Sequence, residues 1–331
     1  MQKHAKKYLF QALKIIFSVG IIYWLVSSGK LNFSALRALL SPIPAALALS
    51  LIGINLFLAS ERWRVLIKTQ GLKAKTGPVF KLSLIGMFFN FAMPGGVGGD
   101  VIKAYYFTRQ NPGSKVIAIT SVLMDRVLGL FSMILMALLV MVYDIDHITH
   151  VPSLMTLFWF IAGLFVAFSF GLALVFSQKL YDKKILSKLL HKLPLSEKLI
   201  KLYESMHLYG RQGRAILGVI LLSLLSQTAA ICFLYLVGNM AGFSDLHAKI
   251  YFLVAPLGFM ATAIPISPAG VGVGQAAFYF LFNIYTGHTT EVGPTTITAY
   301  QVGTFLVSLL GAFFYLRFKG HADIAKVEQF S

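Results

Sequence analysis

The chain has 331 residues, of which 57% are hydrophobic and 12% are charged, and this balance excludes an ordinary soluble domain. Its apolar runs are continuous and about 20 residues long, which indicates membrane-spanning helices and not the short alternating strands of a membrane barrel. The formal net charge of +17 could suggest nucleic-acid binding, but the basic residues lie in loops between apolar runs, so we expect no nucleic-acid partner.

The chain begins with two predicted spans. Residues 1–7 carry three lysines and no acid, so we expect this end to stay in the cytoplasm and residues 8–28 to form an uncleaved first span. Residues 41–60 form the second span, and a strongly basic, cytoplasmic loop follows it. Glu61 and Arg62 open that loop, where they could contact a lipid headgroup or only set the topology.

A glycine-rich break, which includes Gly96 and Gly98, divides residues 79–108 into two short apolar pieces. Each piece is too short to cross the hydrocarbon core at a rise of about 1.5 Å per residue. Both flanks are basic, so we expect a re-entrant hairpin that opens to the cytoplasm. Broken backbone survives in a membrane only inside protein or around a wet cavity, and transporters hold ionic groups at such breaks.

Asp100 and Lys103 directly follow this break, at the start of a short helix. The N-terminus of a helix attracts phosphate, and Lys103 would add a positive charge. Alternatively, Asp100 only caps the helix and Lys103 extends to the membrane interface. No Gly-Lys-Ser/Thr sequence follows, so we expect no nucleotide site.

The third predicted span, residues 116–143, carries Asp125 and Arg126, and charges inside a span usually face the bundle interior or water. We expect Arg126 to bind a lipid phosphate, with Asp125 orienting it or pairing with Lys103. The alternative is a structural ion pair that holds the hairpin against this span.

The second half repeats these features. Spans at 154–177 and 215–240 flank a basic segment, residues 179–213, which predicts one or two interfacial amphipathic helices. A second hairpin, residues 250–287, has few basic flanking residues and is expected to open to the outside. Gly270 and Gly272 belong to its break, and Gln275 opens the following helix as Asp100 does after the first break.

Each half therefore reads as span, span, re-entrant hairpin, span. Residues 1–150 start inside and residues 151–331 start outside, and a last span at 295–317 returns the C-terminus to the cytoplasm. We expect an all-α polytopic membrane protein with one membrane domain, about six transmembrane helices and two opposed re-entrant hairpins in an inverted repeat. Substrate sites of such repeats lie at mid-membrane, and polar residues such as Gln227 and Gln301 could line this one or bond neighbouring helices.

The histidines lack the spacing of a metal site, and no Ser/His/Asp arrangement is evident within the predicted spans. We therefore expect neither a metal, a cofactor nor an established catalytic centre.

Three ordered motifs, MPGGVGGDVIKAY (93–105), MDRVLG (124–129) and IPISPAGVGVGQ (264–275), resemble the lysylphosphatidylglycerol synthase transmembrane-region family, also called flippase-like membrane proteins. The early ERWR (61–64) is also typical of it. In multiple-peptide-resistance proteins this region accompanies a soluble aminoacyltransferase and is thought to move the aminoacylated lipid outward; we expect no such soluble domain here. Members commonly have Glu where this chain has Gln275. This departure argues against a role that requires a carboxylate at this position, such as pairing with a cationic lipid headgroup.

The resemblance implies a bacterial inner-membrane transporter, not an enzyme, that moves a phospholipid or a polyprenyl-phosphate lipid between leaflets. The alternative is a membrane-embedded transferase, or a subunit that presents lipid to a lipid-modifying enzyme partner.

Overall fold

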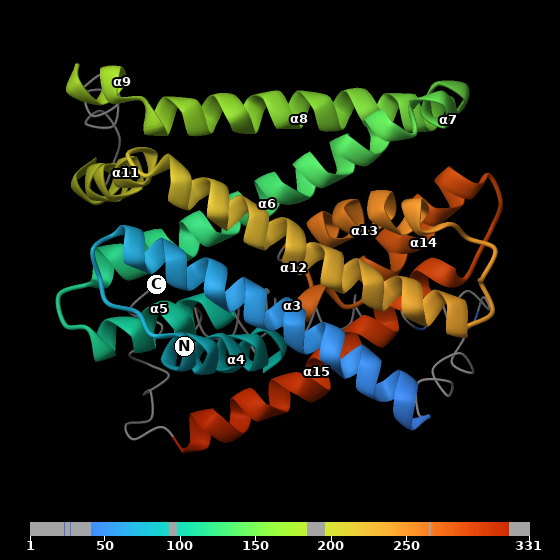
Figure 1. The fold of residues 1–331 in the computed structure, drawn as a ribbon, viewed down its shortest axis with the longest axis horizontal. Helices are drawn as coiled ribbons and strands as arrows, with labels where there is room; N and C mark the ends of the chain where they lie inside the picture. The colour runs from blue at the N-terminus through green and yellow to red at the C-terminus, as the bar shows by residue number, and fades with distance from the viewer. Residues whose placement is uncertain are drawn as a thin grey trace, which may run out of the picture.

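The computed structural model describes residues 41–92, 98–183, 196–264 and 266–317, together with Tyr23 and Ser27. Within these ranges the chain forms α-helices, one short 3-10 helix and brief connections, which confirms the all-α prediction (Figure 1). Most of the predicted first span, Gly96, the middle of the basic segment and the tail after residue 317 lie outside the described residues.

Five described helices, 25 to 29 residues long, are long and apolar enough to cross a membrane. At about 1.5 Å per residue the shortest measures roughly 38 Å, against a hydrocarbon core about 30 Å thick. They correspond to the second through sixth predicted spans, so the multi-pass membrane prediction is confirmed. They are α3 (Pro42–Thr69), α6 (Lys115–Tyr143), α8 (Pro152–Phe176), α12 (Gly213–Met240) and α15 (Val292–Leu316).

Helix α8 lies along one edge of the bundle (Figure 1) and buries only Leu154 and Ile161. Its large apolar side chains point outward, among them Trp159 and Phe170, which are 64% and 63% exposed. A contiguous apolar face of this kind is costly in water and favourable in lipid, so this helix presents a lipid-facing surface.

Two pairs of shorter helices lie toward opposite ends of the bundle (Figure 1). The first pair is α4 (Thr76–Ala92) and α5 (Gly98–Gln110), and the second is α13 (Ala248–Ala263) and α14 (Val273–Thr286). The 3-10 helix η1 (Pro268–Gly270) lies in the second break. These pairs fall where the two hairpins were predicted.

Small residues allow the helices of each pair to approach closely. A Cβ on Gly99 of α5 would lie 2.0 Å from the carbonyl oxygen of Gly86 in α4. In the second pair, a Cβ on Gly258 would lie 2.2 Å from the ring of Phe278. Close backbone approach through glycine is a common way to pack helices in membranes.

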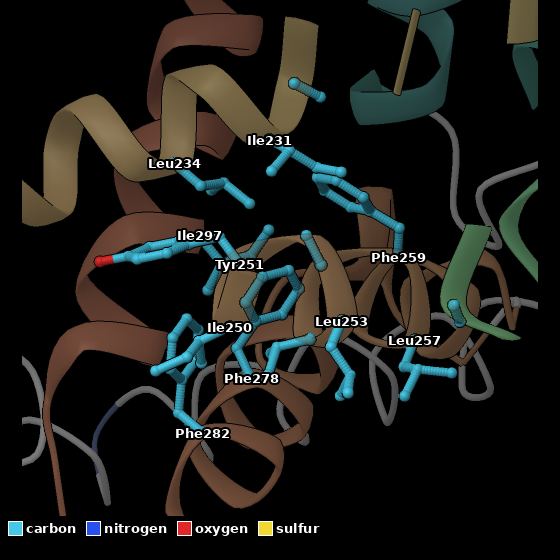
Figure 2. Packing of buried hydrophobic residues seen from close by; sticks show 14 of the residues in the cluster. Ile231, Leu234, Ile250, Tyr251, Leu253, Leu257, Phe259, Phe278, Phe282 and Ile297 are labelled. Atoms are coloured by element: carbon cyan, nitrogen blue, oxygen red, sulfur yellow. The ribbon is translucent and has the colours of Figure 1, made fainter. Parts of the chain in front are cut away.

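Among the described residues, the largest apolar cluster includes side chains of α12, α13, α14 and α15 (Figure 2), together with residues of α3, α6, α7 and α8. Ile231 of α12, Tyr251 of α13 and Phe278 of α14 contribute to it and are completely buried. The second short-helix pair is therefore an integral part of the bundle.

The prediction that Glu61 and Arg62 open a loop is wrong, because α3 continues to Thr69. Trp63, Leu66 and Ile67 are completely buried, and their helical spacing puts an apolar face on this last part of α3. Arg62 therefore projects from a helix, and not from a loop, toward the interior of the protein.

Three short helices complete the described chain. Helix α7 (Ile145–His150) links α6 to α8, and α9 (Gln178–Asp182) and α11 (Ser196–Gly210) lie in the basic segment. Helix α11 packs against α6 and α8.

Candidate functional site

A cavity of about 350 Å³ lies among α3, α4, α6, α12, α13, η1 and α15. Asn90 at the end of α4 and Thr262 at the end of α13 border it, as does Ala269 in η1. The end of α4 and the second break, far apart in sequence, thus border one cavity. The other polar side chains in its lining are Asn55, Arg62, Arg126, Ser226, Gln227, Tyr300 and Thr304.

Arg62 is held in the cavity wall by a bidentate ion pair. Its Nε donates to Oδ1 of Asp125 at 2.7 Å and its Nη2 donates to Oδ2 at 2.9 Å. Its Nη1 also donates to the Ser223 hydroxyl at 3.2 Å, so one guanidinium connects α3, α6 and α12. The Arg62 and Asp125 side chains are only 14% and 11% exposed. Such a buried pair fixes the position of Arg62 because either charge alone would be costly.

Arg126 lies about 16 Å along α6 from its start, near the middle of the helix. Its Nε donates to Oδ2 of Asp100 at 2.5 Å, which ties α6 to the first turn of α5. The Arg126 side chain is 40% exposed and lines the cavity, whereas Asp100 is 14% exposed. Arg126 thus forms an ion pair of the kind that the structural alternative predicted, and it also lines the cavity.

The expectation that Asp125 pairs with Lys103 is wrong, because both carboxylate oxygens of Asp125 accept from Arg62. Lys103 instead places its Nζ 5.1 Å from the centre of the Trp63 ring and is not part of the cavity lining. Glu61 also lies outside the lining and pairs with Arg64. Gly98 is buried in the first turn of α5.

Gln275 is buried behind the second break. Its Oε1 accepts from the backbone N–H of Gly272 at 2.7 Å, and its Nε2 donates to Gln301 at 2.7 Å and to Thr298 at 3.1 Å. It caps α14 and joins it to α15, outside the cavity lining.

Two glycines shape the second break. Gly270 and Gly272 have φ of 71° and 85°, in the left-handed region that glycine adopts easily. A Cβ on Gly270 would lie 2.5 Å from that of Thr262, so this glycine also lets the break approach a cavity-lining residue.

Sequence reasoning missed Asn55, Asn90 and Tyr300. Asn55 and Arg62 are seven residues apart and so share one face of α3, which was the available signal for Asn55. Asn55 donates to the Ser226 carbonyl at 2.8 Å and accepts from the Tyr300 hydroxyl at 3.2 Å, so it joins α3, α12 and α15. Asn90 accepts from the Gly99 N–H at 2.9 Å and thereby connects the two ends of the first break.

Both charged side chains in the described lining are cationic. Arg62 and Arg126 contribute guanidinium groups, while Asp125 and Asp100 lie behind them and no carboxylate is among the described lining residues. Guanidinium groups bind phosphate through paired, charge-assisted hydrogen bonds, so the cavity has the chemistry of an anion site.

Comparison with known proteins identifies the family. The chain is similar to a UPF0104 membrane protein of Methanocaldococcus jannaschii, with 22% identity over 286 residues that cover 81% of this chain and 82% of that protein. The family model described as the lysylphosphatidylglycerol synthase TM region matches residues 11–311. The chain therefore belongs to the lysylphosphatidylglycerol synthase transmembrane-region family.

Proposed function

We propose that this protein is a lipid transporter that moves a phospholipid, or a related polyprenyl-phosphate lipid, between the leaflets of a bacterial inner membrane. The observation that carries the proposal is the shared cavity, which has two arginines in its lining and is bordered by the end of α4 and by the second break. The family name, which refers to a lipid, supports the substrate class.

In this proposal the headgroup enters the cavity while the acyl chains stay in the bilayer. Arg62 and Arg126 bind the phosphate, and Asp125 and Asp100 hold the two arginines in place when no lipid is bound. Arg62 uses three of its five N–H donors for Asp125 and Ser223, so a phosphate can bind it without displacing the carboxylate and leaving that buried charge alone.

Movement between leaflets requires that the cavity open alternately to the two sides. We propose that both short-helix pairs are re-entrant, that they belong to the two halves of an inverted repeat, and that the halves rock against each other. Both chain termini would lie in the cytoplasm. An ion gradient or the lipid's own gradient would drive transport.

The test is movement of fluorescent phospholipids, labelled on an acyl chain, across proteoliposomes, read as protection from dithionite. We expect wild type to move at least one phosphate-bearing lipid, and Arg126→Gln to slow it by about tenfold or more because a charged hydrogen bond to phosphate is lost. Asp100→Asn should also slow it, because Arg126 loses its positioning partner. Arg64→Gln is the matched control: Arg64 is also on α3 and ion-paired, but lies outside the cavity lining, and should leave the rate unchanged.

Wild-type protein that moves none of a panel of phosphatidylglycerol, phosphatidylethanolamine, phosphatidylcholine, phosphatidic acid and polyprenyl phosphate would contradict the proposal. The remaining alternative, a transferase or lipid-presenting subunit, would then be tested by lipid turnover with a partner enzyme.

A further inference from the structure

Gln227 differs from the other polar residues around the cavity. It lines the cavity and is only 6% exposed, and neither its amide nitrogen nor its amide oxygen has a hydrogen-bond partner. Other buried side chains among the described residues also have unpartnered atoms, but Gln227 is the one of them that lines the cavity. Buried polar groups usually have partners, and an exception calls for an explanation.

Its polar neighbours are already engaged. Asn55 bonds with Ser226 and Tyr300, and Asn90 bonds with the backbone of Gly99. These hydrogen bonds hold Asn55 and Asn90 in place. In contrast, both the amide nitrogen and the amide oxygen of Gln227 have no hydrogen-bond partner.

Gln227 also lies close to the proposed phosphate site. It follows Ser223 by one helical turn, about 6 Å along α12, on the same helix face. Ser223 is the residue that accepts from Nη1 of Arg62. A headgroup whose phosphate is bound by Arg62 would therefore extend next to Gln227, whose three rotatable side-chain bonds allow its amide to turn toward the cavity.

We propose that Gln227 selects lipids in which a neutral, hydroxyl-bearing group, such as glycerol or a sugar, is joined to the phosphate. This inference rests on the proposed transport function and adds the substrate class. An amide both donates and accepts hydrogen bonds, as does a hydroxyl group. A quaternary ammonium can do neither, so it would leave the Gln227 amide without a partner. Phosphatidic acid carries the phosphate without the hydroxyl-bearing group.

The experiment measures binding and movement separately. Binding is read as the rise in melting temperature of the full-length protein in detergent with short-chain phosphatidylglycerol, phosphatidylinositol, phosphatidic acid or phosphatidylcholine. Movement is read in proteoliposomes with the corresponding fluorescent lipids. The variant is Gln227→Met, which keeps the side chain's length and removes its hydrogen-bonding groups. Tyr251→Phe is the matched control, because it also removes a buried, unpartnered polar group but lies outside the cavity lining.

We expect wild type to prefer one of the two hydroxyl-bearing lipids over phosphatidic acid by about tenfold, the effect of one or two hydrogen bonds. Gln227→Met should lose this preference while it still binds and moves phosphatidic acid, and Tyr251→Phe should keep it. Equal preference in wild type and Gln227→Met would overturn the role of Gln227 and leave lipid transport standing. If wild type moves no lipid but binding still shows the Gln227-dependent preference, the transport proposal fails and the recognition site stands.

Discussion

Asp125 and Arg126 are consecutive residues of α6 that form ion pairs with two different helices. Adjacent residues on a helix point about 100° apart, so Asp125 reaches Arg62 of α3 while Arg126 reaches Asp100 of α5. Charges at this depth are costly in a membrane unless they are paired or face water. The arrangement places two arginines at the cavity, each held in position by a carboxylate.

The Arg62–Asp125 pair makes a prediction about stability. Asp125→Asn leaves the buried Arg62 without its counter-charge, and we expect the free energy of unfolding to fall by about 3–5 kcal/mol. The double variant Arg62→Gln with Asp125→Asn removes both charges and should recover part of that loss. Thermal unfolding of the purified variants in one detergent measures the difference. Losses that simply add in the double variant would show that the two side chains do not stabilise each other.

Among the elements, the long helices and the breaks between shorter ones could be predicted from the sequence, whereas the end of α3 could not. The long helices were predictable because each is a continuous apolar run, and the breaks were predictable because glycine and proline interrupt such runs. The end of α3 was not, because charged residues after residue 60 suggest a loop, whereas Trp63 and Ile67 pack inward and keep the helix intact.

The candidate site was also predictable only in part. Arg126 and Gln227 stand out as polar residues within apolar runs. The partner of Asp125, however, lies 63 residues away in the chain, and no local pattern specifies which helices will be neighbours. Gln275 follows the second break as Asp100 follows the first, which suggested a similar role. In the structure, however, the Gln275 side chain caps α14 and donates a hydrogen bond to Gln301 of α15.

Close packing within the first short-helix pair gives a prediction about Gly99. Its substitution by alanine would place a Cβ 2.0 Å from the carbonyl oxygen of Gly86, so α4 and α5 must move apart. We expect Gly99→Ala to destabilise the protein by about 1–3 kcal/mol, the usual cost of overpacking. Transport should also slow, because Asp100 is the next residue and would move relative to Arg126.

The control for this substitution is Gly163→Ala in α8, where a Cβ would meet nothing within 4 Å. Alanine is favoured over glycine inside a helix by about 1 kcal/mol, so this variant should be as stable as wild type or slightly more stable. Melting temperatures and lipid movement are compared for both variants. A Gly99→Ala protein that matches Gly163→Ala in both measurements would contradict the close approach of α4 and α5.

At the scale of the whole molecule, the two short-helix pairs lie toward opposite ends of the bundle (Figure 1). The end that contains α13 and α14 is joined to α6 and α7 by a polar cluster: Asp144 accepts from Lys249 at 2.8 Å and from Tyr285, and His147 contacts the Tyr285 ring. Burial alone would raise the pKa of Asp144, but hydrogen bonds from Lys249 and Tyr285 outweigh it and hold that pKa below its ordinary value. The carboxylate is thus charged at neutral pH and links α6 to α13 and α14 at this end. The charge distribution of the sequence predicts that this end faces the outside.

This arrangement predicts that the two pairs open to opposite sides of the membrane. Gln110 ends α5 and Thr289 lies between α14 and α15, and both side chains are exposed. In a background with the single cysteine removed by Cys232→Ala, we introduce Gln110→Cys or Thr289→Cys and label with a membrane-impermeant maleimide. Position 289 should react in right-side-out vesicles and position 110 only in inverted ones, because the positive-inside bias places the basic flanks of the first pair in the cytoplasm. Reaction of both positions from the same side would contradict the inverted repeat and, with it, the alternating access that the proposed transport requires.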